Sequence, residues 1–324
     1  IEERLPPEAA EPATAALDAV NFTSVALETL RADILQPALD AARSELADQP
    51  RVRARLSQSL ADAGRELGLL EFAEAAQLEA LELRERMLGT EHPDTLWSLA
   101  SLVVLRIEQS RPADAVDVAR RSVELHRRVL GDSVETLDAI SAYGSILRAL
   151  ERLEEALPYY EEAYEGRRRL HGPDDPGTLV TLSNLGFINR ALGRLDEAAD
   201  IFRRTYEARR RLFGPDDSRT LSSMINYAGS LRTSGRFVEA EPLYVTAVEG
   251  HRRLHGDEHP RTLISLSNLG LFYVTAGRPD EALPILREAV DGSVALHGAE
   301  AVWTVVATIN LGRALTGTGA LDEA

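Results

Sequence analysis

The sequence predicts an all-α solenoid of antiparallel helix pairs that repeat about every 42 residues. Of its 324 residues, 44% are hydrophobic and only 5% aromatic, and Leu, Ala, Arg and Glu, which favour helices, dominate. A glycine that closes a basic-aliphatic run recurs at intervals of 41 or 42 residues, and a threonine follows each one. Such self-similarity indicates stacked helical hairpins, each burying its apolar face against its neighbours.

The recurring residues define one common register. The glycines are Gly89, Gly131, Gly172, Gly214, Gly256 and Gly298, and the threonines, taken as position zero, are Thr95, Thr136, Thr178, Thr220, Thr262 and Thr304. The one short interval arises because the loop after Gly131 lacks one residue. Counting back from Thr95 by one period gives Arg53, so the sequence contains seven registers.

Each repeat contains two helical patterns. In the repeat of Thr178, the first stripe lies at +1, +4, +7, +8 and +11: Leu179, Leu182, Leu185, Gly186 and Asn189. Gly193 ends this helix, because glycine accepts a positive φ angle. Asp196 and Glu197 open a second helix with acid in its first turn. Its core stripe is Ala198, Phe202, Tyr206 and Leu212, and Gly214 ends it. The two helices are expected to pack antiparallel.

The pattern at +4, +7, +8, +11, +20 and +24 resembles the tetratricopeptide repeat (TPR) family. Segments 256–263 (Gly-Asp-Glu-His-Pro-Arg-Thr-Leu), 268–273 (Asn-Leu-Gly-Leu-Phe-Tyr) and 90–96 look like the 42-residue kinesin-light-chain subtype. The resemblance implies a right-handed superhelical array over residues 51–324, with about seven repeats and the last truncated. It departs from the pattern where Ser110 and Glu151 replace the turn glycine.

Segment 27–76, above all 46–56, is similar to the entry into TPR arrays of bacterial serine/threonine protein kinases. The kinase motifs themselves, such as the glycine-rich loop, are absent from this sequence. The similarity implies one alternative function, a regulatory or assembly region of a larger bacterial enzyme.

The two ends differ from the repeats. Residues 1–16, with three prolines, are expected to form a linker or frayed arm. Residues 17–50 are expected to form capping helices, either one kinked helix or two short ones, because Pro37 interrupts the helical spacing. At the other end the seventh second helix is cut off near residue 321, which predicts an uncovered apolar face and allows self-association as a further alternative.

In the TPR family, positions +2, +5, +6, +9, +12 and +13 of the first helix line a concave groove. Position +6 offers Asn184, Asn226, Asn268 and Asn310, and position +12 offers Arg148, Arg190 and Arg232. An Asn amide can bond a peptide backbone, and an Arg fork suits a carboxylate. Trp97, Phe187 and Leu271 are the apolar anchors expected there.

Each of these assignments has a structural alternative. The asparagines could bond a neighbouring repeat and fix the stacking, and the arginines could be solvated or paired with Asp and Glu. Trp97 could pack against the N-terminal helices. The sequence leaves both readings open.

Composition excludes several classes of function. The chain has no cysteine and hence no disulfide or thiolate site, and its formal charge of −16 disfavours nucleic acid as partner. The sequence contains no run of 18 apolar residues, so a membrane-spanning helix is not expected. The His residues are interpreted as structural, and neither a catalytic constellation nor a cofactor or metal site is expected. The sequence therefore predicts a non-catalytic scaffold, expected in the cytoplasm or on a membrane-anchored protein, that binds a peptide or protein segment.

Overall fold

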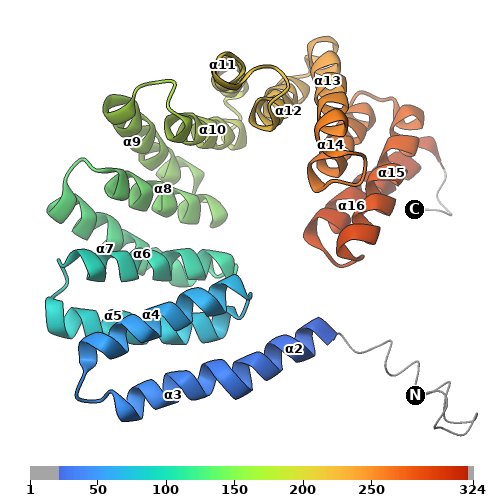
Figure 1. Cartoon of the computed structure of the whole chain (residues 1–324). Helices are drawn as coiled ribbons and strands as arrows, with labels where there is room; N and C mark the ends of the chain where they lie inside the picture. The colour runs from blue at the N-terminus through green and yellow to red at the C-terminus, as the bar shows by residue number, and fades with distance from the viewer. Residues whose placement is uncertain (1–21, 320–324) are drawn as a thin grey trace, which may run out of the picture. The chain divides into compact units, whose positions relative to one another are not determined.

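The computed structural model describes residues 22–319 of the chain, and all secondary structure within this range is helical (Figure 1). Its first unit, within Ile1–Arg152, contains α2 (Phe22–Leu30), a π-helical turn η1 (Arg31–Leu35), α3 (Gln36–Glu45), α4 (Pro50–Glu66), α5 (Leu70–Leu88), α6 (Pro93–Glu108), α7 (Pro112–Leu130) and α8 (Val134–Ala149).

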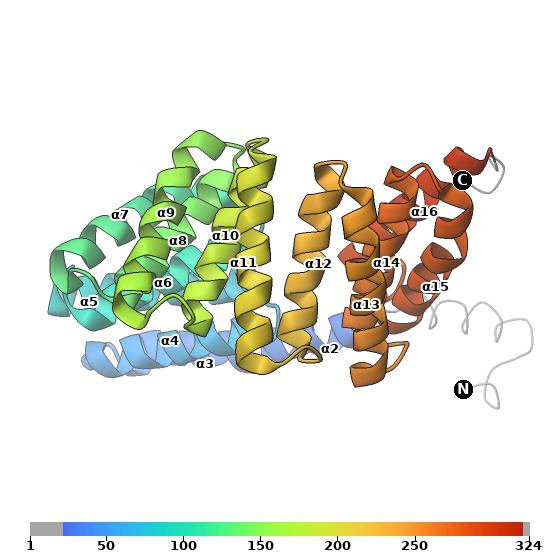
Figure 2. The ribbon, with the colours of Figure 1, turned by 90° about the horizontal axis from the view of Figure 1, so that it is seen from above.

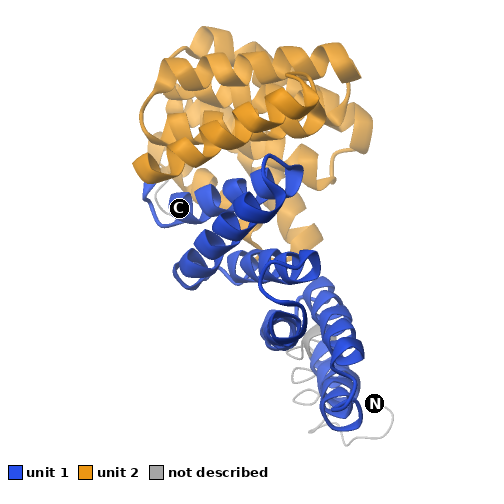
Figure 3. Cartoon of the chain, turned by 90° about the vertical axis from the view of Figure 1, so that its left-hand side faces the viewer, with its two compact units in different colours: residues 1–152 blue, residues 153–324 orange. Residues whose placement is uncertain are grey.

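The second unit, within Leu153–Ala324, begins between the two helices of the third predicted repeat. It contains α9 (Leu153–His171), α10 (Pro176–Ala191), α11 (Leu195–Phe213), α12 (Ser218–Thr233), α13 (Phe237–His255), α14 (Pro260–Thr275), α15 (Pro279–His297) and α16 (Val302–Thr318). Figure 3 colours the two units separately. The expected linker 1–16 and the truncated helix after residue 320 lie outside the described residues.

Within each unit, consecutive helices pack as hairpins, for example α4 with α5 and α14 with α15. First helices of adjacent repeats also touch each other: α6 contacts α8, and α14 contacts α16. Figures 1 and 2 show α14, α15 and α16 side by side. The all-α array of helix pairs predicted from the sequence is therefore confirmed.

Packing is close at position +20, near the start of each second helix. All six residues there are alanines with no exposed surface: Ala73, Ala115, Ala156, Ala198, Ala240 and Ala282. A methyl side chain lets the two helices of a pair approach closely, and any larger side chain would overpack the contact.

The glycine–threonine spacing has a direct cause in two loops. The Oγ1 of Thr95 donates to the carbonyl oxygen of Gly89 at 2.8 Å, and Thr262 does the same to Gly256 at 2.8 Å. Both glycines have a φ of 87°, which ends the preceding helix. The buried threonine thus ties the start of one helix to the end of the previous one.

The turn between the helices of a pair also uses positive φ. Gly193, Gly235 and Gly277 adopt φ values of 75°, 74° and 75°. Ser110 and Glu151, the two departures from the family pattern, adopt the same conformation with φ of 56° and 59°. The backbone geometry is therefore kept even where the residue type is unfavourable.

Before the repeats, the π-helical turn η1 lies directly ahead of Pro37, which stands in the first turn of α3. Proline lacks an N–H and crowds the preceding turn, and a π-turn accommodates both. Leu35 and Leu39 pack with Leu60 and Phe72 of the first repeat. From Phe22 to Glu45 the segment is thus one continuous helical run with a π-turn ahead of Pro37, and it covers apolar residues of the first hairpin.

Candidate functional site

Position +31 of each second helix lies at the junction between two repeats. It is occupied by Arg84, His126, Arg167, Arg209, His251 and Ser293. At three junctions this side chain bonds a serine at +3 of the next first helix: Arg84 to Ser98, Arg209 to Ser223 at 2.8 Å and His251 to Ser265 at 2.7 Å. The bond links the second helix of one repeat to the first helix of the next.

At two junctions position +3 is an alanine, which has no hydroxyl to form this bond. Position +3 is Ala139 in the third repeat and Ala307 in the seventh. At the first of them, His126 contacts its own helix, with Nδ1 2.8 Å from the carbonyl oxygen of Ser122. At the second, the partner position holds only the short Ser293. A cavity lies at each of these two junctions, of about 590 Å³ and about 340 Å³.

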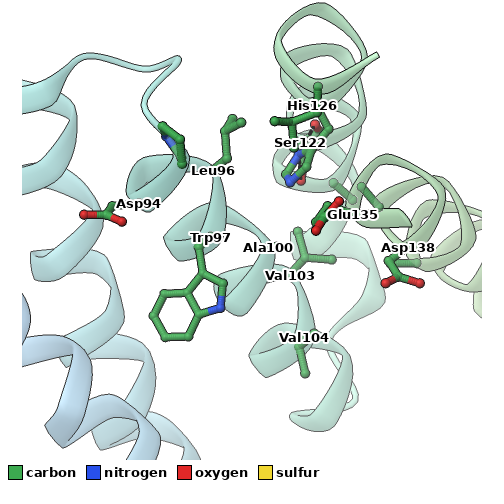
Figure 4. A pocket seen from close by; sticks show the side chains of 15 residues that line it. Asp94, Leu96, Trp97, Ala100, Val103, Val104, Ser122, His126, Glu135 and Asp138 are labelled. Carbon is green, nitrogen blue, oxygen red and sulfur yellow. Dashed lines mark hydrogen bonds between the residues drawn. The ribbon is translucent and has the colours of Figure 1, made fainter. Parts of the chain in front are cut away.

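The first cavity lies within the first unit, between α6, α7 and α8. Its walls are mainly apolar: Leu96, Trp97, Ala100, Val103, Val104, Ala119, Leu130, Ala139 and Ala142. Trp97 is 50% exposed. Asp94, Glu135 and Asp138 also line it and are exposed. Figure 4 shows Trp97 and Val104 on α6, His126 on α7, and Glu135 and Asp138 on α8.

The second cavity lies within the second unit, at equivalent positions of α14, α15 and α16. It brings together three of the predicted site residues, Asn268, Leu271 and Asn310. Trp303, which is 55% exposed, and Arg313 line it as well. Both cavities therefore open between first helices, on the arc where the sequence places the groove.

The predicted asparagines make structural bonds at this second cavity. Asn310 is 5% exposed and its Nδ2 donates to Ser267 Oγ of the preceding repeat at 3.1 Å. Asn268 donates to the carbonyl oxygen of Ile264 in its own helix at 2.8 Å. Asn184 and Asn226 are half-buried on α10 and α12. The bond of Asn310 matches the stacking role that the sequence left open.

Two of the predicted arginines meet in the second unit. Arg190 lies over the rings of Phe187 and Phe202, at 5.3 and 5.9 Å from their centroids. Arg232 donates to Thr275 Oγ1 at 3.1 Å. Burial lowers the pKa of the Arg190 guanidinium, and the nearby charge of Arg232 lowers it further.

Within the described residues, no carboxylate forms an ion pair with Arg190 or Arg232. Burial raises the pKa of Tyr244, while the charges of both arginines act in the opposite direction, so its phenol lies near both of them. The third predicted arginine, Arg148, is exposed on α8 in the other unit. The structure thus brings two of the three predicted arginines, Arg190 and Arg232, close together.

The apolar anchors differ from one another. Phe187 is half-buried and packs edge-on against Phe202, with centroids 5.0 Å apart. Its ring therefore contributes to its own hairpin as well as to the Arg190 contact. Trp97 lies over Arg84, 5.6 Å from the guanidinium carbon. Half of its surface is exposed.

The two junction positions, +3 and +31, went unnoticed in the sequence. Their signal is present, because Ala interrupts a column of Ser and Thr at +3 in the third and seventh repeats only. A comparison of the residues at one register position across all repeats, rather than of the faces of a single helix, would have located both cavities.

An array of paired helices with side-chain cavities between successive first helices defines a helical-repeat protein. A family model of the tetratricopeptide repeat matches residues 52–128, 135–211, 181–247 and 216–293. The chain belongs to the tetratricopeptide repeat family.

The curated relatives match a small part of their own length. A clustered mitochondria protein homolog of Coccidioides immitis (strain RS) is 29% identical over 135 residues, which is 40% of this chain and 10% of that protein. The chain thus spans about one tenth of the curated relatives it matches.

Solved structures share the fold at low sequence identity. A putative kinesin light chain with TPR-like repeats from Podosopora anserina has a TM-score of 0.56 at 20% identity, covering 64% of this chain and 99% of that one. The apo quorum sensor NprR from B. thuringiensis has a TM-score of 0.63 at 12% identity, covering 97% and 88%. A Rap protein complexed with competence and sporulation factor has a TM-score of 0.53 at 12% identity, covering 83% of this chain and 76% of that one. The likeness to kinesin light chain repeats expected from the sequence is confirmed.

Among the described helices, none combines the length and apolar character needed to cross a bilayer. Across the same residues, no three His, Asp or Glu side chains gather in a way that could hold a metal ion.

Proposed function

We propose that this chain is a non-catalytic scaffold whose first helices hold a peptide or protein segment. One observation carries the proposal: in each unit, the same register positions line a cavity between successive first helices, with an exposed tryptophan beside it. Trp97 is 50% and Trp303 55% exposed. Exposed aromatic residues next to a pocket are typical anchors of protein interfaces.

The arginines support a polar contribution to binding. Arg190 and Arg232 lack a carboxylate partner in the described part of the chain, and their mutual proximity is electrostatically unfavourable. A carboxylate of a bound segment would relieve this repulsion and accept forked hydrogen bonds. We therefore assign carboxylate recognition to this pair, and backbone recognition to the half-buried amides of Asn184 and Asn226, with Asn268 as a further candidate.

The comparisons support a protein partner at the level of the fold. The Rap protein with a similar fold was solved with the competence and sporulation factor bound. Tetratricopeptide arrays have large surfaces formed by repeated hairpins, which suit extended partners.

A peptide-library selection on the whole chain tests the proposal. Selected peptides are re-measured by calorimetry on Asn226→Ala and on the double variant Arg190→Gln, Arg232→Gln. We expect the double variant to weaken peptides with a free C-terminal or side-chain carboxylate by tenfold or more. Arg203→Gln, an exposed arginine of α11 paired with Asp200, is the matched control. Selected peptides that bind all variants equally would contradict the proposal.

Two wider assignments accompany this proposal. The scaffold is placed in the cytoplasm, in keeping with its cysteine-free composition. The alternative, a regulatory region of a larger enzyme such as a serine/threonine kinase, is decided by the gene that encodes the chain, because a kinase domain carries recognisable motifs.

Self-association is a second candidate, supported by α16. Its apolar residues are unusually exposed, from 40% for Val306 to 73% for Val302. Light scattering over a range of concentrations tests it, with Ile309→Asp as the variant. A mass that stays monomeric at all concentrations would exclude this function.

A further inference from the structure

Two guanidinium groups lie close together in the second unit without a counter-ion. Arg190 of α10 and Arg232 of α12 occupy position +12 of consecutive repeats, and both are half-buried. Although the chain has a formal charge of −16, no acidic residue within residues 22–319 forms an ion pair with either of them. The pair therefore holds two positive charges that the described protein does not neutralise.

The arginines at the same register position of other repeats are in different surroundings. Arg65 of the first repeat is compensated, because its Nη1 lies 3.7 Å from Glu108 Oε1. Arg148 of the third repeat is exposed, so water can solvate its charge. The half-buried, uncompensated pair is therefore a property of the fourth and fifth repeats and not of position +12 in general.

Packing orients both guanidinium groups and leaves donors unused. Arg190 stacks over the rings of Phe187 and Phe202, at 5.3 and 5.9 Å from their centroids, and in the described part of the chain none of its N–H groups donates to a protein acceptor. Arg232 donates through Nη1 to Thr275 Oγ1 at 3.1 Å. Its Nε is buried and has no hydrogen-bond partner among the described residues, which is unfavourable unless an acceptor binds there.

Gly229 leaves open space beside these donors. A Cβ added to this glycine would lie 3.4 Å from Arg190 Nη1 and 3.4 Å from the Tyr244 hydroxyl. The neighbouring repeats have the larger Phe187 and Leu271 at this position, +9. Burial raises the pKa of Tyr244, so its hydroxyl keeps its proton and can act as a third donor.

The number of donors and the charge favour a tetrahedral dianion over a carboxylate. A carboxylate has one negative charge and two oxygens in one plane, which a single guanidinium fork can hold. A phosphorylated side chain has a charge of about −1.5 to −2 at pH 7 and three acceptor oxygens. Two guanidinium groups and one phenol, which come from α10, α12 and α13, match the dianion in both respects.

These features define the preferred ligand of the arginine pair. We propose that Arg190, Arg232 and Tyr244 bind the phosphoryl group of a phosphoserine or phosphothreonine in a partner polypeptide. The two guanidinium groups neutralise the dianion, and the phenol donates to its third oxygen. The inference rests on the proposed scaffold function and deepens it, because a carboxylate binds the same arginines more weakly than the phosphoryl group does.

Fluorescence anisotropy of labelled peptide pools tests this preference on the whole chain. Three degenerate hexapeptide pools with blocked C-termini have the same non-acidic flanking mixture and differ only in the fixed central residue, which is phosphoserine, glutamate or serine. We expect the phosphoserine pool to bind at least tenfold tighter than the glutamate pool, and the serine pool to bind most weakly. Inorganic phosphate, added as a competitor, should need at least a tenfold higher concentration than the phosphoserine peptides.

Four variants locate the effect. Arg190→Gln with Arg232→Gln should weaken the phosphoserine pool tenfold or more, and Tyr244→Phe, which removes only the hydroxyl, threefold or more. Gly229→Leu introduces the residue type that the sixth repeat has at +9, fills the space, and should abolish the preference for phosphoserine. Arg65→Gln, the matched control at position +12, should leave all affinities unchanged. Circular dichroism verifies that each variant folds.

The outcomes separate this inference from the proposed function. Equal binding of the phosphoserine and glutamate pools, or equal losses from Arg65→Gln and the double variant, would overturn the phosphoryl preference while leaving the scaffold function intact. Displacement by inorganic phosphate at the concentration of the peptides themselves would also overturn it, because the site would then recognise the free ion. If no pool and no peptide of a random library binds the unsubstituted chain, the scaffold function itself fails.

Discussion

Gly270 on α14 packs directly against Leu286 on α15: a Cβ added to this glycine would lie 2.4 Å from the leucine Cγ. Leu286 has no exposed surface, so it cannot move aside. Gly270→Ala should therefore destabilise the chain by about 1–2 kcal/mol, because overpacking costs about 1–3 kcal/mol and the gain in helix propensity is about 1 kcal/mol or less. Urea denaturation measures the change.

Gly312 provides the matched control for this prediction. It occupies the same register position on α16, but an added Cβ would meet nothing within 4 Å. Gly312→Ala should stabilise the chain by about 0.5–1 kcal/mol through helix propensity alone. Equal effects of the two substitutions would contradict the packing account.

Glu151 is a second site where stability can be improved. Its φ of 59° places a residue with a Cβ in the left-handed region, which costs about 1–2 kcal/mol. Glu151→Gly should raise the free energy of unfolding by about 0.5–1 kcal/mol, since the more flexible unfolded chain returns part of the gain. Thermal denaturation followed by circular dichroism provides the measurement.

The reverse change tests the same argument. Gly235 has a φ of 74° and open space around it, so Gly235→Glu carries only the backbone cost. We expect it to destabilise the chain by about 1 kcal/mol. A neutral result at both positions would show that these turns relax without strain.

His251 gives the chain a specific acid sensitivity. It is 1% exposed, its Nδ1 lies 2.7 Å from Ser265 Oγ, and burial lowers its pKa to about 4. Because the unfolded chain binds a proton near pH 6.5 and the folded one does not, stability is full above pH 6.5 and falls as the pH drops towards 4. The loss at pH 5 should reach about 2 kcal/mol.

His251→Gln, which keeps a polar side chain but cannot titrate, isolates this contribution. Urea denaturation at pH 7.5 and pH 5.0 should show a smaller loss for the variant than for the unsubstituted chain. His171→Gln, an exposed histidine at the end of α9, is the control and should leave the difference unchanged. An equal pH effect in all three proteins would exclude His251 as the cause.

Most of the fold could be predicted because each signal is local and repeated. The glycine before Thr262, the buried Ala240 and the turn at Gly277 have counterparts in most other repeats, so weak signals that recur along the chain add up to one strong pattern. The π-turn ahead of Pro37 occurs once. Its form depends on how a single proline is accommodated, which periodicity does not reveal.

The candidate site was predicted less completely, for a physical reason. A helical wheel locates the arc that carries Asn268, Leu271 and Trp97, but it contains no information on the second helix behind that arc. Each cavity lies at a junction where the residues at +31 and at the next +3, 13 or 14 positions apart, do not bond each other, whereas Arg209 and Ser223 do so at their junction. Asn310 likewise bonds Ser267 of another repeat, a contact that no single helix displays.

Photo-crosslinking of a library-selected peptide tests the central claim most directly. The peptide carries a benzoylphenylalanine, and mass spectrometry identifies the residues that it labels on the unsubstituted chain. The account predicts crosslinks on first helices, α6 and α8 or α12, α14 and α16, near Trp97, Arg232 or Trp303. Crosslinks confined to the exposed faces of second helices, such as α7, α11 or α13, would contradict it.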